Sequence, residues 1–176
     1  MKLLILDLDE TLVYSTLDAV SPHCTKRAVE GNEYYTMFRP GLHPFLHHVR
    51  KYFECYIWST GQQPYVEDVW SHIDMDGFKL WGRNFCSHTS TNPNEPYEKP
   101  LRKITDDLTQ AIIVDNTASV FAKTPLNGIE IRTWHGDQSD TELEHLAHYL
   151  DWLRHQTSFQ RDHSAWRFET LCLRSK

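Results

Sequence analysis

Short apolar runs alternate along this chain with segments in which apolar residues recur every three or four positions. The apolar runs have the length of strands and are residues 3–6, 55–58, 78–81, 111–114 and 129–131. The helical spacing covers residues 42–53, 64–73 and 143–153. Strands that alternate with helices predict right-handed crossovers, and therefore an α/β fold with a mainly parallel sheet and flanking helices.

Two segments depart from this alternation. Residues 15–32 are polar without a clear period and precede a run rich in Tyr and Thr at 33–38, so we expect a flap-like loop followed by a strand. Residues 83–100 contain three prolines, which prevent long regular structure, and a short helix is expected over 101–108. Each possible insertion has only about twenty residues, which leaves no room for a large cap domain.

Length and charge limit the class of protein. The 176 residues are 40% hydrophobic, which is enough for the core of one domain. The apolar run 3–6 is too short for a signal peptide or a membrane span, so we expect a cytoplasmic or nuclear protein that is not secreted. A formal net charge of −6 argues against broad binding to nucleic acid or to anionic membranes. An anionic substrate would therefore need a local positive site.

The polar residues of interest follow two of the buried strands. Asp7 and Asp9 come directly after residues 3–6, and Asp115 and Asn116 come at the end of the run 111–114. An isolated pair of aspartates after a strand is more often a turn cap, but two such strand ends can meet at the ligand-binding edge of a sheet. Magnesium prefers oxygen ligands of this kind. We expect the Asp7 carboxylate, the Asp9 carbonyl and either Asp115 or Asn116 to bind Mg²⁺.

The sequence around these aspartates resembles a known family. Residues 7–11, Asp-Leu-Asp-Glu-Thr, resemble the D-x-D-x-T signature of the haloacid dehalogenase superfamily. The longer form, DLDETLVYS, is similar to the family of RNA polymerase II C-terminal-domain phosphatases and small C-terminal-domain phosphatases, the NLI-interacting-factor-like family. The resemblance covers roughly residues 3–153. It implies a Rossmann-like, capless phosphatase domain over residues 1–157 and a C-terminal tail, residues 158–176, of unknown role.

The resemblance also implies roles for individual residues. Asp7 is the nucleophile by position, and Asp9 is the general acid and base. Lys99, in a Tyr-x-Lys setting, is expected to assist catalysis and bind phosphate. The other substrate and phosphate contacts implied by the resemblance are Ser59, Thr60 and Tyr65, and the implied metal site contains Asp7, Asp9, Asp115 and Asn116.

Together these residues predict a magnesium-dependent phosphatase that forms a phospho-aspartyl intermediate on Asp7. Its expected substrates are phosphoserine and phosphothreonine residues of a protein or peptide, with Lys26 and Arg27 of the flap favouring acidic neighbours. One alternative is a small-molecule phosphatase of the same superfamily, although such enzymes usually have a cap. Another is an inactive protein-binding module, although the site residues are intact. Arg39 is expected to have a structural role.

Overall fold

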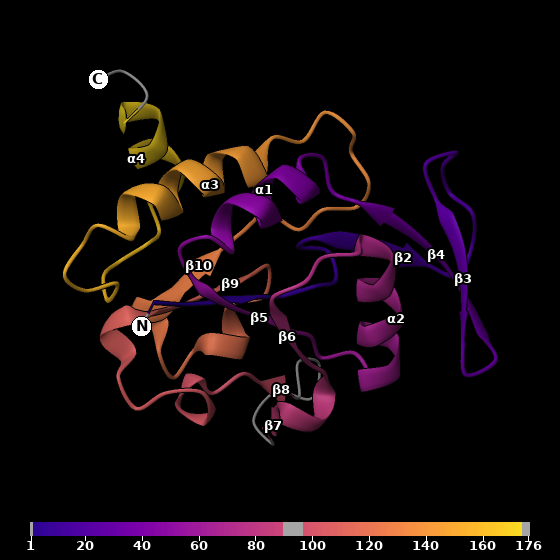
Figure 1. Cartoon of the computed structure of the whole chain (residues 1–176), viewed down its shortest axis with the longest axis horizontal. Coiled ribbons are helices and arrows are strands. Elements are labelled where there is room, and N and C mark those ends of the chain that lie inside the picture. Colours follow the sequence, from indigo (N-terminus) through magenta and orange to yellow (C-terminus); the bar gives the residue numbers. More distant parts are fainter. Residues whose placement is uncertain (1, 90–96, 174–176) are drawn as a thin grey trace.

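The computed structural model describes residues 2–89 and 97–173. A five-stranded parallel sheet forms its centre, with strand order β10-β9-β1-β5-β6 (Figure 1). The strands are β1 (Leu3–Leu6), β5 (Glu54–Trp58), β6 (Phe78–Trp81), β9 (Ala111–Asp115) and β10 (Gly128–Glu130). All four neighbouring pairs are parallel, so the predicted α/β fold with a parallel sheet is confirmed.

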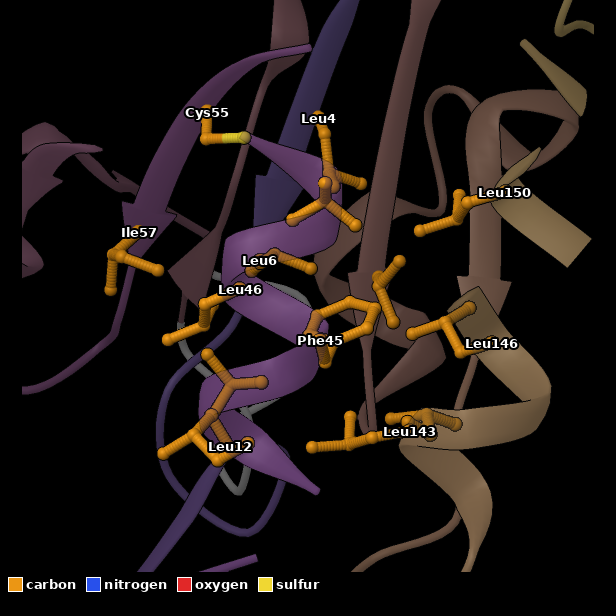
Figure 2. Packing of buried hydrophobic residues seen from close by; sticks show 14 of the residues in the cluster. Leu4, Leu6, Leu12, Phe45, Leu46, Cys55, Ile57, Leu143, Leu146 and Leu150 are labelled. Carbon is orange, nitrogen blue, oxygen red and sulfur yellow. The ribbon is translucent and has the colours of Figure 1, made fainter. Parts of the chain in front are cut away.

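Helices cover one face of this sheet. They are α1 (Leu42–Val49), α2 (Gln63–Ile73) and α3 (Glu142–Leu153), and α4 (Trp166–Leu173) packs on the outside of α3 (Figure 1). Figure 2 shows Leu4 and Leu6 of β1 close to Phe45 of α1 and Leu146 of α3. Successive strand residues point to opposite faces, so Leu3 and Ile5 enter a second core instead. The central strand is therefore buried on both sides.

Turns close the second core. They are the 3-10 segments η1 (Arg83–Phe85), η2 (Leu101–Lys103), η3 (Leu108–Gln110), η4 (Ala118–Phe121) and η5 (Pro125–Asn127). The helix predicted over residues 101–108 is present only as the single turn η2, because Thr105 and Asp107 bind nearby backbone amides. Asp107 N donates to Thr105 Oγ1 at 3.1 Å, and Thr109 N donates to Asp107 Oδ1 at 2.9 Å. Such local bonds compete with helical ones.

The segment after β1 forms a small sheet. The strand predicted over residues 33–38 is confirmed, whereas the loop predicted over residues 15–32 is wrong in part, because residues 25–29 form a further strand. Strands β2 (Val13–Thr16), β3 (Thr25–Val29) and β4 (Asn32–Phe38) are antiparallel in the order β2-β4-β3. We call these three strands the flap. Most side chains of β3 are exposed, so no alternation of polar and apolar residues identifies it. Glu30 and Gly31 form the tight turn between β3 and β4, and both have positive φ, as a two-residue hairpin requires.

Two further segments complete the description. Strands β7 (Ser87–His88) and β8 (Tyr97–Glu98) pair with each other, and residues 90–96 of the predicted loop lie outside the described residues. In the C-terminal segment, Phe159 and Trp166 are buried in the main core. Trp166 Nε1 donates to Glu130 O at 3.1 Å. Residues 158–173 thus pack on the sheet and on α3. Within 2–89 and 97–173, no helix has the length and apolar character needed to cross a membrane.

Candidate active site

The polar strand ends meet at the carboxyl edge of the central sheet. Leu6, the last residue of β1, pairs with Ile57 of β5 on one side and with Val114 of β9 on the other. The next residues along β1 and β9 are Asp7 and Asp115, so this register brings their carboxylates together. A cavity of about 180 Å³ opens there, lined by Asp7, Asp9, Glu10, Thr60, Tyr97, Lys99, Asp115, Asn116, Thr117 and Val120.

Lys99 joins two of the carboxylates. Its Nζ donates to Asp7 Oδ1 and to Asp115 Oδ2, both at 2.6 Å, and the side chain is 1% exposed. The backbone N of Lys99 donates to Val120 O at 2.8 Å, which anchors the residue after β8. Burial by itself disfavours the ammonium, but the two carboxylates outweigh it and raise the pKa of Lys99 above its ordinary value. The lysine therefore carries its charge inside the protein.

Both carboxylate oxygens of Asp115 have hydrogen-bond partners. Oδ2 accepts from Lys99, and Oδ1 accepts from Thr117 N at 2.9 Å. Burial and the neighbouring Asp7 raise the pKa of Asp115, whereas Lys99 acts in the opposite direction. Asn116 also lines the cavity, and its Oδ1 accepts one long hydrogen bond, from Thr11 Oγ1 at 3.4 Å. Of the two neighbours, Asn116 has the less engaged oxygen.

Asp9 is held by two hydroxyl groups. Ser59 Oγ donates to Oδ2 at 2.9 Å, and the Tyr65 hydroxyl donates to Oδ1. Burial raises the pKa of Asp9 from its ordinary value to about 6, the Asp7 charge adds to this, and the two hydroxyl donors act against it. A carboxyl group with such a pKa can both hold and release a proton near neutral pH, as a general acid and base must.

The two donors depend on a glycine between them. Gly61 N donates to Ser59 Oγ at 2.8 Å, which orients that hydroxyl. A Cβ at Gly61 would lie 2.9 Å from Tyr65 Cδ1 and 3.0 Å from Ser59 Oγ, closer than carbon and oxygen atoms normally approach. A side chain at this position would displace both donors from Asp9. Because Gly61 has no side chain, the phenol ring of Tyr65 on α2 can reach Asp9, which follows β1.

Six of the eight site residues expected from the sequence line the cavity, and two lie beside Asp9. The six are Asp7, Asp9, Thr60, Lys99, Asp115 and Asn116. Ser59 and Tyr65 contact the Asp9 carboxyl group instead. The sequence did not point to Thr117, because its contribution is a backbone amide, which leaves no signal in the residue type.

Positive residues of the flap are already paired. Lys26 Nζ lies 2.8 Å from Glu33, and Arg27, which is buried, lies 3.8 Å from Asp68 of α2. Neither cation lines the cavity. The expected preference for acidic neighbours therefore loses its basis. Arg39 forms a bidentate ion pair with Asp140 at 2.8 and 2.9 Å, which joins the end of the flap to the loop before α3, as expected of a structural residue.

Acidic strand ends at the edge of a parallel sheet, joined by one lysine, define a protein of the haloacid dehalogenase fold class. The chain matches the family model described as NLI interacting factor-like phosphatase over residues 2–160. It belongs to that family.

Curated relatives agree with this assignment. CTD small phosphatase-like protein 2 of Dictyostelium discoideum is 36% identical over 155 residues, which are 84% of this chain and 26% of that protein. CTD nuclear envelope phosphatase 1B of Danio rerio is 31% identical, covering 87% of this chain and 67% of that protein. The human CTD small phosphatase-like protein is 28% identical, covering 86% and 56%. The chain thus spans between about a quarter and two thirds of these relatives.

Solved structures share the fold. The RNA polymerase II CTD phosphatase Fcp1 superposes with a TM-score of 0.70 at 19% identity, covering 87% of this chain and 62% of that one. Fission yeast Fcp1 bound to beryllium fluoride gives a TM-score of 0.61 at 18% identity, covering 99% and 62%. The haloacid dehalogenase fold expected from the sequence is confirmed.

Proposed function

We propose that this chain is a magnesium-dependent phosphatase that forms a phospho-aspartate on Asp7 and acts on phosphoserine and phosphothreonine residues of proteins. The observation that carries the proposal is the placement of Lys99 between Asp7 and Asp115, 2.6 Å from each. The lysine fixes Asp7 Oδ1 at the cavity wall, so the carboxylate has a defined orientation for attack on phosphorus. Its ammonium is also placed to stabilise negative charge on the phosphoryl oxygens.

The cavity fits a magnesium ion by its charge and its ligands. Four carboxyl groups face a single lysine, so a dianionic phosphate monoester requires further positive charge. The Asp7 carboxylate, the Asp9 carbonyl and the Asn116 amide would hold the ion through oxygen. Asp115 is the weaker candidate, because both its oxygens have partners. Once bound, Mg²⁺ would polarise the phosphoryl oxygens and neutralise their charge.

These ligands differ from a cluster of acidic, histidine or cysteine side chains. Among the described residues, no group of three or more His, Cys, Asp or Glu is arranged to hold a metal. The proposed ligand set includes one backbone carbonyl and one amide, which such a cluster does not contain. Asn116 supplies the amide oxygen of this set, and neutral oxygen ligands of this kind suit magnesium.

Two proton transfers complete the reaction. As the Asp7 carboxylate forms a bond to phosphorus, the bond from phosphorus to the seryl or threonyl oxygen breaks, and Asp9 gives its proton to that oxygen. Asp9, now ionised, then takes a proton from the water that attacks the phospho-aspartate. Inorganic phosphate leaves, and Asp7 and Asp9 return to their initial states. The raised pKa of Asp9 suits both directions of transfer.

The surroundings of the cavity favour a protein substrate. Among the described residues no cap domain covers it, and a second depression of about 440 Å³ continues from it between the flap and α2. The two share Asp9, Glu10 and Thr60, so a chain bound in the depression would place its phosphorylated residue at Asp7. The curated relatives are named CTD phosphatases, and the structurally similar Fcp1 is an RNA polymerase II CTD phosphatase, which supports a phosphoprotein substrate. A cytoplasmic or nuclear location agrees with such substrates.

The direct experiment compares substrate classes with purified protein and Mg²⁺. Phosphoserine and phosphothreonine peptides are expected to give higher kcat/KM than sugar phosphates and nucleotides, and EDTA is expected to remove the activity. A metabolite that exceeds every peptide by orders of magnitude would support the small-molecule alternative. Binding of phosphopeptides without any turnover would support the inactive module.

A further inference from the structure

Two hydroxyl groups of the flap extend the hydrogen-bond chain that begins at Asp9 and Tyr65. Ser15 Oγ is 2.8 Å from the Tyr65 hydroxyl, and Thr36 Oγ1 is 2.9 Å from Ser15 Oγ. Ser15 of β2 and Thr36 of β4 are directly opposite each other in the antiparallel register. Thr36 is 1% exposed, so its hydroxyl is removed from bulk solvent. A continuous series of hydroxyl groups therefore runs from inside the flap to the Asp9 carboxyl group.

The single proton of each hydroxyl determines the direction of this series. Tyr65 has one proton, and in its bond to ionised Asp9 it is the donor, because a carboxylate can only accept; in the protonated acid, the Asp9 proton is then left for the leaving oxygen. The Tyr65 oxygen must then accept from Ser15, and Ser15 must accept from Thr36. All three donors point toward Asp9. In such a chain each bond polarises the next one, which strengthens the bond that reaches the carboxylate.

The other oxygen of Asp9 has an equivalent arrangement. Ser59 donates to it and in turn accepts from Gly61 N, so a backbone amide orients the Ser59 proton. On the Tyr65 side, Ser15 takes the place of that amide. Each oxygen of Asp9 thus receives a hydroxyl donor that is itself fixed from behind. Gly61 N, which orients Ser59, lies in the loop after β5, whereas Ser15, which orients Tyr65, belongs to the flap.

We propose that Ser15 and Thr36 are positioning residues for proton transfer by Asp9. The inference rests on the proposed function of Asp9 as general acid. Without Ser15, the Tyr65 hydroxyl keeps its bond to Asp9 but loses the donor that fixes its own orientation, and the carboxyl group is less well aligned with the leaving oxygen. Neither residue touches the cavity, so neither is a contact of the phosphate.

The consequence depends on the leaving group. A seryl oxygen is a strongly basic leaving group and needs the proton as its bond to phosphorus breaks. A p-nitrophenolate ion is weakly basic and leaves without it. Misalignment of Asp9 should therefore slow formation of the phospho-aspartate from a phosphoserine peptide while sparing its formation from p-nitrophenyl phosphate. A general loss of folding would slow both.

The test measures kcat/KM for these two substrates in Ser15→Ala and Thr36→Val, because kcat/KM reports the steps up to formation of the phospho-aspartate and not its later hydrolysis, in which Asp9 serves both substrates alike. We expect kcat/KM for the phosphoserine peptide to fall by roughly 10-fold or more, which is part of the ~10²- to 10⁴-fold that a general acid contributes. The kcat/KM for p-nitrophenyl phosphate is expected to change by less than about threefold. Ser15→Thr and Thr36→Ser, which keep the hydroxyl groups, should retain the peptide activity.

Thr25→Val is the matched control. Thr25 lies on β3 opposite Thr36, on the other side of β4 from Ser15, and is exposed. Its replacement should change neither rate. Equal losses for both substrates in Ser15→Ala, or no loss for either, would overturn the inference, and thermal melting shows whether Thr36→Val still folds. If the wild-type protein hydrolyses neither substrate with Mg²⁺, the proposed function fails and this inference fails with it.

Discussion

The ammonium group of Lys99 lies as close to Asp115 as it does to Asp7, 2.6 Å in both cases. Asp115 is therefore more than a neighbour of the nucleophile: it holds the cation that orients it. Thr117 N holds Asp115 in turn. The nucleophile, the lysine and the second aspartate form one buried unit, and changes to any of them should affect the others.

Asp7→Asn should abolish turnover, because an amide cannot attack phosphorus as a carboxylate does. The measurement is phosphate release from a phosphoserine peptide, together with detection of labelled phospho-enzyme after an acid quench. Asp106→Asn, which changes an exposed aspartate outside the cavity, is the control and should behave as wild type. Normal rates in Asp7→Asn would exclude Asp7 as the nucleophile.

Lys99→Met should destabilise the fold, because it leaves Asp7 and Asp115 buried without their cation. Removal of one partner from a buried ion pair typically costs ~3–5 kcal/mol. Burial already raises the pKa of Asp115, so its ionised form opposes folding once the lysine is gone. The loss should therefore be larger at pH 7 than at pH 5, where protonation relieves it.

Urea unfolding of Lys99→Met and wild type at the two pH values, both in EDTA, measures this difference. Lys103→Met is the control for loss of a positive charge, since that lysine is exposed. A loss in Lys99→Met that does not depend on pH would show that the carboxylates do not titrate in response to it.

Activity on peptides should decline as the pH rises above about 6, the pKa of Asp9, because the leaving oxygen requires the protonated acid. The Tyr65 hydroxyl bond stabilises ionised Asp9 and lowers its pKa. Tyr65→Phe removes that bond, so the pKa of Asp9 should rise and the alkaline limb of kcat/KM should move to higher pH. Profiles of both proteins over pH 4.5–9 measure the shift. A limb that moves to lower pH would contradict this account of the Tyr65 bond.

Peptides with a basic residue beside the phosphorylated one should be preferred. Glu10 and Glu30 line the depression next to the cavity. Arg83 also lines it, but its Nε donates to Thr60 O at 2.6 Å, so the two glutamates outnumber it. Lys26 and Arg27 are paired elsewhere. Exposed charge pairs contribute ~0.2–1 kcal/mol, so a preference of about two- to fivefold in kcat/KM is expected. Glu30→Lys should reverse the preference, and Glu33→Gln, which is outside the depression, should not. Loss of the preference at high salt would agree with its electrostatic origin.

Asn116→Ala should raise the Mg²⁺ concentration needed for half-maximal activity, on the order of tenfold or more. Its amide oxygen is the proposed ligand that no other side chain replaces. Titration of activity with Mg²⁺ measures the effect, and Asn84→Ala, at an exposed site away from the cavity, is the control. An unchanged Mg²⁺ requirement in Asn116→Ala would indicate that Asp115, and not Asn116, is the metal ligand.

The sequence was sufficient for the centre of the sheet because β1 and β9 are buried on both faces. Residues 3–6 and 111–114 are wholly apolar, so neither their type nor the position of Asp7 and Asp115 at their ends was ambiguous. The flap strand β3 was missed because pairing, and not burial, stabilises it. Because most of its residues are exposed, polar and apolar residues do not alternate along it as they do in a half-buried strand.

The sequence alone could not predict the contacts between segments that are distant along the chain. The hydrogen bonds that join Tyr65 to Asp9 and Ser15 connect residues more than 45 positions apart. They depend on the space that Gly61 leaves for the Tyr65 ring, since a Cβ at this position would lie 2.9 Å from Tyr65 Cδ1. Tyr65 was placed near the substrate by resemblance, but its role beside Asp9 required the three-dimensional arrangement.

The packing of the C-terminal segment has a practical consequence for making shortened forms of this protein. The family match ends at residue 160, yet His163 accepts the Tyr149 hydroxyl of α3 at 2.8 Å, and Trp166 is buried in the core. A chain cut at residue 160 would leave that hydroxyl and the Glu130 carbonyl without these partners, and it would expose an apolar strip of α3. Such a fragment should be prone to self-association, whereas a chain that ends after residue 173 keeps this surface covered.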